Sequence, residues 1–105
     1  MSVFADDSPV LSASSYIDPT QGLVASAVLL SEAVVAALGN TARVTVDLAG
    51  LRSLSSSFFN TLLLGVASRF GTEAIRNRLL FRFSSVAQQE IFKRSYTAVL
   101  RNLGT

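Results

Sequence analysis

The sequence predicts one α/β domain over residues 1–105, with a small mixed or parallel sheet of about four strands and helices packed chiefly on one face. Two observations lead to this prediction. Of the residues, 50% are apolar and only 15% are charged, a composition typical of a compact domain rather than a disordered chain. Segments with the period of strands alternate with segments with the period of helices, which favours strands joined by right-handed helical crossovers.

The first strand is expected at residues 9–17, where apolar residues bracket a stretch rich in serine and alanine. The first helix should begin at residues 18–21, since Asp18 can cap it and Pro19 lacks the N–H that would stay unpaired there. An apolar stripe follows, and residues 39–40, Gly-Asn, should end the helix. The stripe consists of Leu23, Ala27, Leu30, Val34 and Leu38.

The second strand is expected at residues 44–48, where alternation places Val44, Val46 and Leu48 on one side of the sheet. The serine run at residues 55–57 then predicts the cap of a second helix, which Gly71 should end. The buried face of this helix is expected to consist of Phe58, Phe59, Leu62, Leu63, Val66, Ala67 and Phe70.

The last third of the chain repeats the pattern. Residues 72–77 are interpreted either as a polar link or as a helical extension, and residues 79–83 predict the third strand. Two serines at 84–85 then cap the last helix. The expected core consists of Leu30, Val34, Val44, Val46, Leu48, Phe59, Leu62, Leu63, Val66, Leu80, Phe81, Phe83 and Ile91.

The side chains that catalysis usually needs are missing from the sequence. There is no cysteine and no histidine, which removes disulfides, thiolates, the commonest general base and the commonest metal ligand. Lys93 is the only lysine, and no Gly-x-Ser-x-Gly motif places a serine beside a base. Acidic residues do not cluster with metal-ligand spacing, and no glycine-rich phosphate loop is present. We therefore expect a non-enzymatic protein with no cofactor and no metal.

The expected location is the cytoplasm. Residues 1–7 contain no basic residue and end in two aspartates, unlike the start of a secretory signal. The most apolar stretch, residues 23–38, is interrupted by serine and glutamate and is too short to span a bilayer comfortably. We interpret it as a buried helix.

Residues 44–58, VTVDLAGLRSLSSSF, resemble the central signature of STAS domains, the anti-sigma-factor-antagonist domains also found in sulfate transporter tails. In that family an apolar strand ends in Asp or Asn plus Leu, and a short linker leads to Asp-Ser-Ser-Gly at the start of a helix. Here these four positions are Ser55, Ser56, Ser57 and Phe58. Serine replaces the family aspartate and phenylalanine the family glycine. This helix start is similar to that of the STAS-like domains of unknown function, which tend to carry Ser-Ser-Phe at the same place.

The resemblance implies a regulatory protein-binding module of bacterial origin that exchanges partners. The implied partner is a serine-kinase anti-sigma factor with a histidine-kinase-like ATPase fold. The implied phosphorylation candidates are Ser57 and Ser56. Ser57 occupies the position of the serine that is phosphorylated in the family. The first turn of a helix tolerates a phosphate because its N–H groups are unpaired and its dipole end is positive. The partner-binding surface would consist of Asp47, Ser55, Ser56, Ser57 and Asn60.

Simpler interpretations of the same residues remain open. Ser55 or Ser56 can be no more than the cap of the helix, with Ser57 an ordinary residue of its first turn. Asp47 can simply accept hydrogen bonds from backbone N–H groups of the loop that follows it.

Charge is unevenly distributed along the chain. The first 50 residues hold five acidic residues and one arginine, whereas residues 51–105 hold eight basic and two acidic residues. This predicts a basic face, for which ordinary solvated surface is the simpler interpretation. The face would consist of Arg69, Arg76, Arg78, Arg82, Lys93 and Arg94, with Arg101 beside them.

Two alternative functions follow from these patterns. The basic half could bind nucleic acid or an acidic protein surface, although no helix-turn-helix or RNA-binding motif is recognisable. The helix expected to end at Leu38 is apolar nearly all round, which would suit a homodimer or a larger assembly of this chain.

Overall fold

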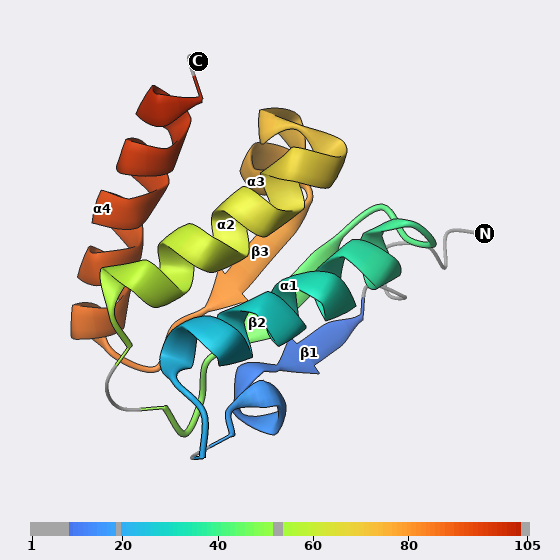
Figure 1. Cartoon of the computed structure of the whole chain (residues 1–105). Coiled ribbons are helices and arrows are strands. Elements are labelled where there is room, and N and C mark those ends of the chain that lie inside the picture. The colour runs from blue at the N-terminus through green and yellow to red at the C-terminus, as the bar shows by residue number, and fades with distance from the viewer. Residues whose placement is uncertain (1–8, 19, 52–53, 104–105) are drawn as a thin grey trace.

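The structure is a computed structural model, and it describes residues 9–18, 20–51 and 54–103 (Figure 1). Three strands form a parallel sheet in the order β1-β2-β3: Val10–Ser12, Val44–Asp47 and Leu79–Arg82. The α/β class is confirmed, and both strand pairs are parallel. The fourth strand that we predicted is not found among the described residues.

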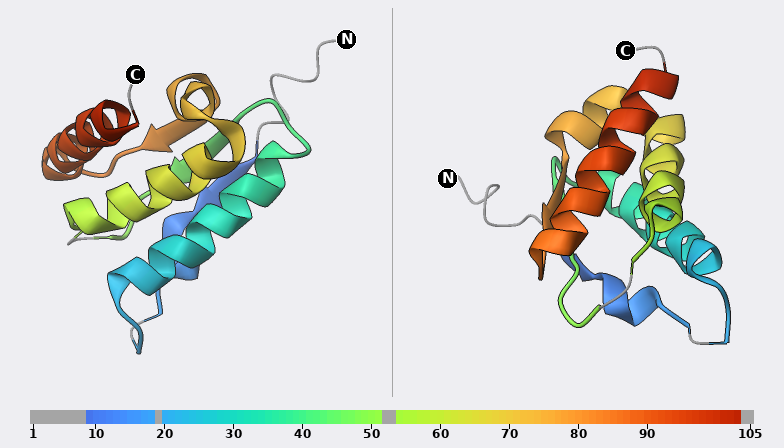
Figure 2. Two further views of the ribbon diagram at one scale, coloured as in Figure 1. Left: turned by 45° about the horizontal axis from the view of Figure 1, so that its top comes forward. Right: turned by 90° about the vertical axis from the view of Figure 1, so that its left-hand side faces the viewer.

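The α-helices of the described residues are α1 (Leu23–Leu38), α2 (Ser56–Phe70), α3 (Thr72–Asn77) and α4 (Val86–Asn102). Helices α1 and α2 lie side by side on one face of the sheet, and α4 lies beside α2 near β3 (Figure 2). Among the described elements none covers the opposite face, which we call the open face of the sheet.

The first strand is shorter than predicted. It ends at Ser12, and Ala13–Tyr16 form a short 3-10 helix instead of continuing the strand to Ile17. The register explains this difference, because Ser12 pairs with Asp47, the last residue of β2. Beyond that point the neighbouring strand offers no partner for the ladder.

The start of the first helix was also predicted wrongly. Helix α1 begins at Leu23 after Gly22, not at Asp18. The Asp18 carboxylate instead accepts hydrogen bonds from the Thr20 hydroxyl (2.7 Å) and the Thr20 N–H (2.9 Å), which lower the pKa of Asp18. The N–H of Asp18 donates to the hydroxyl of Ser26 (3.2 Å), which anchors this turn on α1. The role predicted for Pro19 lies outside the described residues.

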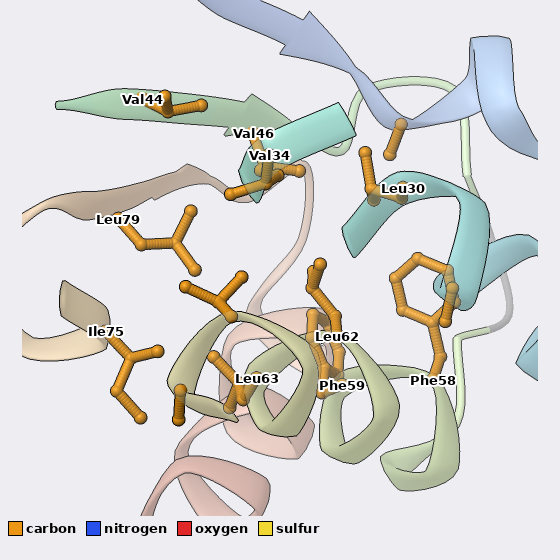
Figure 3. Close-up of a cluster of buried hydrophobic side chains, with 14 of the residues drawn as sticks. Leu30, Val34, Val44, Val46, Phe58, Phe59, Leu62, Leu63, Ile75 and Leu79 are labelled. Carbon is orange, nitrogen blue, oxygen red and sulfur yellow. The ribbon is translucent and has the colours of Figure 1, made fainter. Parts of the chain in front are cut away.

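The core lies between the sheet and the two helices that cover it (Figure 3). As predicted, the alternating valines of β2 are fully buried, and so are the apolar residues that α1 and α2 direct toward them. The fully buried residues include Leu30, Val34, Val44, Val46, Leu48, Phe58, Phe59, Leu62, Leu63 and Val66.

The prediction that Leu80 belongs to the core is wrong. The side chain of Leu80 is 43% exposed, whereas that of Leu79 is only 4% exposed. Alternation along β3 turns Leu79 and Phe81 toward the helices and Leu80 toward the open face. Of the other predicted aromatic positions, Phe81 and Phe83 pack at the rim of the core and are partly buried.

Helices α1 and α2 come very close to each other at Gly65. A Cβ atom at this position would lie 2.7 Å from Oγ and 2.8 Å from Cβ of Ser31 on α1. Both distances are far shorter than van der Waals contact. The Ser31 side chain is buried, and its hydroxyl donates to the carbonyl of Val28 (2.9 Å), so moving it away would break this hydrogen bond.

We expect Gly65→Ala to lower the free energy of unfolding by about 1–3 kcal/mol, because the added methyl group must force the two helices apart. Urea unfolding followed by circular dichroism measures this change. In a Ser31→Gly background the same substitution should cost much less, since both clashing atoms are gone. An equal cost in the two backgrounds would contradict the contact.

Candidate functional site

The start of α2 presents the serine run on the surface. As predicted, Ser55 caps the helix, and its hydroxyl accepts a hydrogen bond from the N–H of Phe58 (3.3 Å). Ser56 and Ser57 occupy the first turn with exposed side chains, and this turn contains no acidic residue. The positive end of the helix dipole therefore lies beside an exposed pair of hydroxyl groups.

Phe58, which stands in place of the glycine of the STAS signature, is a core residue. Its side chain is fully buried and packs edge-to-face against Phe59, with ring centroids 5.6 Å apart (Figure 3). Phe59 in turn packs against Phe92 of α4 at 5.5 Å. These contacts fix the rotation of α2 about its axis, so that Ser57 points away from the core.

Two buried polar residues of α4, neither of which we predicted, hold the start of α2 in place. The hydroxyl of Ser95 donates to the carbonyl of Ser56 (3.1 Å). The side-chain amide of Gln88 donates to the carbonyl of Leu51 (2.8 Å) and accepts from the N–H of Ser84 (2.8 Å). Gln88 therefore joins the loop before α2 to the loop before α4.

A local signal for Gln88 was present in the sequence. Ser85 caps α4 by accepting from the N–H of Gln88 (3.1 Å), which is the spacing of a capping box. In an ordinary capping box the glutamine would bond back to the N–H of the cap residue. Here its amide turns inward and is 2% exposed, so its partners are set by the packing of the loops.

A cavity of about 320 Å³ opens between α2 and α4 beside the serine run. We call it the α2–α4 cavity, and its lining consists of Ser56, Asn60, Ile91, Arg94, Ser95 and Ala98. The structure thus brings Ser56 and Asn60 of the predicted partner surface together with Arg94 of the predicted basic face. The oxygen Oδ1 of Asn60 is buried and has no hydrogen-bond partner among the described residues.

The carboxylate of Asp47 is bound by groups other than the serines. Its carboxylate accepts from the N–H of Ala49 (3.0 Å) and lies 4.0 Å from the guanidinium of Arg82. Because neighbouring Val46 is buried under the helices, Asp47 faces the open face of the sheet. This geometry matches the simpler interpretation, in which the carboxylate accepts a bond from the following loop.

The structure divides the predicted basic face among several surfaces. The guanidinium of Arg78 donates to the carbonyls of Leu38 (2.7 Å), Thr41 (2.9 Å) and Ala42 (2.8 Å), and it lies 5.2 Å from the ring centroid of Phe70. Arg78 therefore stabilises the turn between α1 and β2 through these hydrogen bonds.

The other cations lie on different elements. Arg69 lines a groove between α1 and α2, Arg76 lies at the end of α3, and Arg82 is on the open face. On α4, Lys93, Arg94 and Arg101 line a hollow of about 390 Å³, whose other lining residues are Thr97 and Ala98. Only this last group gathers several basic residues on one surface.

Two kinds of feature are absent from the residues that the structure describes. Their acidic side chains form no group of three or more that could hold a metal ion. None of the helices in the described segments has the length and hydrophobicity needed to cross a membrane.

The chain is similar to a known protein family. The model of the family described as a STAS-like domain of unknown function (DUF4325) matches residues 26–87. The matched segment includes the serine run and Asn60 but ends before Arg94 and Ser95. No curated protein and no solved structure matches the chain.

We expect Gln88→Leu to lower the free energy of unfolding by about 2–4 kcal/mol, because the carbonyl of Leu51 and the N–H of Ser84 would lose their shared partner. Urea unfolding measures the loss. Gln89→Leu is the matched control, since Gln89 is exposed, and it should change stability by no more than about 0.5 kcal/mol. Equal effects of the two substitutions would show that the buried amide does not hold the loops.

Proposed function

The chain belongs to the family of STAS-like domains of unknown function, and from this membership we propose that it is a non-enzymatic regulatory module that binds a protein partner around the start of α2. One observation carries the proposal. Two hydroxyl groups stay exposed on a helix start that buried contacts hold rigidly, with Phe58 on one side and Ser95 on the other. A rigid surface loses little conformational entropy when a partner binds.

The chemistry around Ser57 supports a binding role over a catalytic one. A serine nucleophile needs a base within hydrogen-bond distance and a third group that orients this base. The chain has no histidine, and within the described residues the Ser57 hydroxyl makes no hydrogen bond to another side chain. Its exposure suits modification or contact with a partner.

Phosphorylation of Ser57, with Ser56 as the second candidate, is the switch in this proposal. A phosphate there would add about −1.5 to −2 charge next to the positive end of the helix dipole, so it would leave the helix intact while changing the surface. By family resemblance the partner is a serine-kinase anti-sigma factor or a related ATPase. The cytoplasmic, bacterial setting expected from the sequence belongs to the same proposal.

We expect phosphate on Ser57 in protein isolated from its native cells, as measured by mass spectrometry of its peptides. A photo-crosslinking amino acid at position 60 should capture the partner covalently in the same cells, and purified partner then allows affinity measurements. Ser57→Asp should change the affinity by about tenfold or more, since it places a charge in the contact surface. Ser57→Ala should bind as the unmodified protein does.

The control for charge alone is Gln89→Glu, which adds one negative charge to the exposed start of α4. It should leave partner affinity unchanged. If Ser57→Asp binds every captured partner as tightly as the unchanged protein, the switch is wrong. If crosslinking at position 60 captures no protein, the proposed binding surface is wrong.

A second candidate function is self-association, and one observation favours it. The outward side of α1 exposes Val24 (48%), Val28 (42%) and Leu29 (45%), and neighbouring α2 adds Leu64 (43%). Glu32 is the only charged residue of α1. Exposed apolar residues grouped on one helix are typical of a surface that another protein covers. We propose a second copy of this chain as an alternative occupant.

We expect Leu29→Glu to shift any dimer toward monomer in sedimentation velocity at high protein concentration, because a charge would be buried in the contact. Val86→Glu is the control, since Val86 is 72% exposed at the start of α4. The unchanged protein should be dimeric and the control should stay so. A strictly monomeric unchanged protein would contradict self-association.

A further inference from the structure

We infer that the α2–α4 cavity binds the carboxylate of an acidic residue in an extended segment of the protein partner. This inference rests on the proposed function, because it names the partner chemistry that the surface around the start of α2 would recognise. Four of the six lining residues are polar, and they come from two helices that are far apart in the sequence. Three properties of the cavity select the ligand.

The first property is an available cation. Arg94 is exposed, lines the cavity, and makes no ion pair or hydrogen bond within the part of the chain that the structure describes. A guanidinium can bind a carboxylate through two parallel hydrogen bonds. Ser56, on the opposite wall, belongs to the first turn of α2, whose positive dipole end adds to the attraction. An anionic group is therefore favoured between the two helices.

The second property is an acceptor that lacks a donor. The oxygen Oδ1 of Asn60 is buried without a partner in the described part of the chain, and a buried polar atom normally has one. Neither a carboxylate nor a phosphodiester can supply the missing donor, because both groups only accept hydrogen bonds. The backbone N–H of a peptide can, once the Asn60 amide turns this buried oxygen into the cavity. A peptide segment with an acidic side chain can bind both groups, because its carboxylate pairs with Arg94 and its backbone N–H donates to Asn60.

The third property is the continuation of the cavity along α4. The neighbouring hollow shares Arg94 and Ala98 with the cavity and adds Lys93, Thr97 and Arg101. Glu90 is the only acidic residue of α4, and it lines neither hollow. The surface along α4 is therefore basic over two of its turns. A second acidic residue of the same segment can bind there, so the favoured partner segment carries more than one carboxylate.

A peptide probe tests this inference on the full chain. The probe is acetyl-Gly-Glu-Gly-Glu-Gly-amide, and its uncharged control replaces both glutamates by glutamine. Titration at low salt is followed by the amide resonances of the ¹⁵N-labelled protein. The glutamate peptide should shift the resonances of Ser56, Asn60 and Ser95 in a saturable way, and the glutamine peptide should bind about tenfold more weakly or not at all. Equal binding of the two peptides would overturn the inference.

Two variants and a rival probe sharpen the test. Arg94→Gln should weaken binding of the glutamate peptide about tenfold, whereas Arg76→Gln, the same charge change at an exposed residue of α3, should leave it unchanged. An octathymidylate strand serves as the rival. If it shifts the same resonances and displaces the peptide, or if Arg94→Gln binds the peptide as well as the unchanged protein, the inference is wrong.

The peptide test and the crosslinking test fail separately. If the peptide does not bind but crosslinking at position 60 still captures a partner, the proposed function stands. The inference that the cavity binds an acidic segment of this partner is then wrong. If the peptide binds at the cavity but no partner is captured in cells, the ligand chemistry stands and the proposed function is wrong.

Discussion

The close contact between Gly65 of α2 and Ser31 of α1 is the constraint on which the rest of the structure depends. The sheet of the described residues has three strands and is therefore narrow, and α1 and α2 must share one of its two faces. They can do so only if their backbones approach closely, because wider spacing would leave the valines of β2 partly uncovered. Helix α2 then lies between α1 and α4 and supplies the central side chains of the core.

The same packing positions the candidate site. Once α2 is held by α1 and by the sheet, its first turn lies beside α4. Ser95 and Gln88 then bind the backbone of that turn and of the loop before it. Because these two side chains are buried, the start of α2 cannot move without breaking their hydrogen bonds. The exposed serines are thereby attached to a helix start that buried hydrogen bonds hold in place.

Only one of the two walls of the α2–α4 cavity lies within the segment that matches the family. The wall formed by Ser56 and Asn60 lies within the segment that matches the STAS-like family, whereas the wall formed by Arg94 and Ser95 follows that segment. A partner that binds between them would contact both.

The sequence by itself determined the elements whose signals are local. Ser55 and Gly71 bound α2, Ser85 caps α4, and alternation buries Val44 and Val46, because capping and periodicity act within a few residues. Only the tertiary structure decided the length of β1, the face of the sheet that the helices leave open and the role of Arg78, because these depend on partners far along the chain. The open face is what leaves Leu80 exposed.

The candidate site divides in the same way. Its serine run followed from the sequence, since a cap and an exposed first turn are local features. Its second wall did not, because Ser95 meets Ser56 across 39 positions and Gln88 meets Leu51 across 37. The uneven charge along the chain also did not predict one basic face, because β3 and the helices carry those residues to different surfaces. Hydrogen bonds and packing between distant segments, which no local pattern encodes, created the cavity beside the serines.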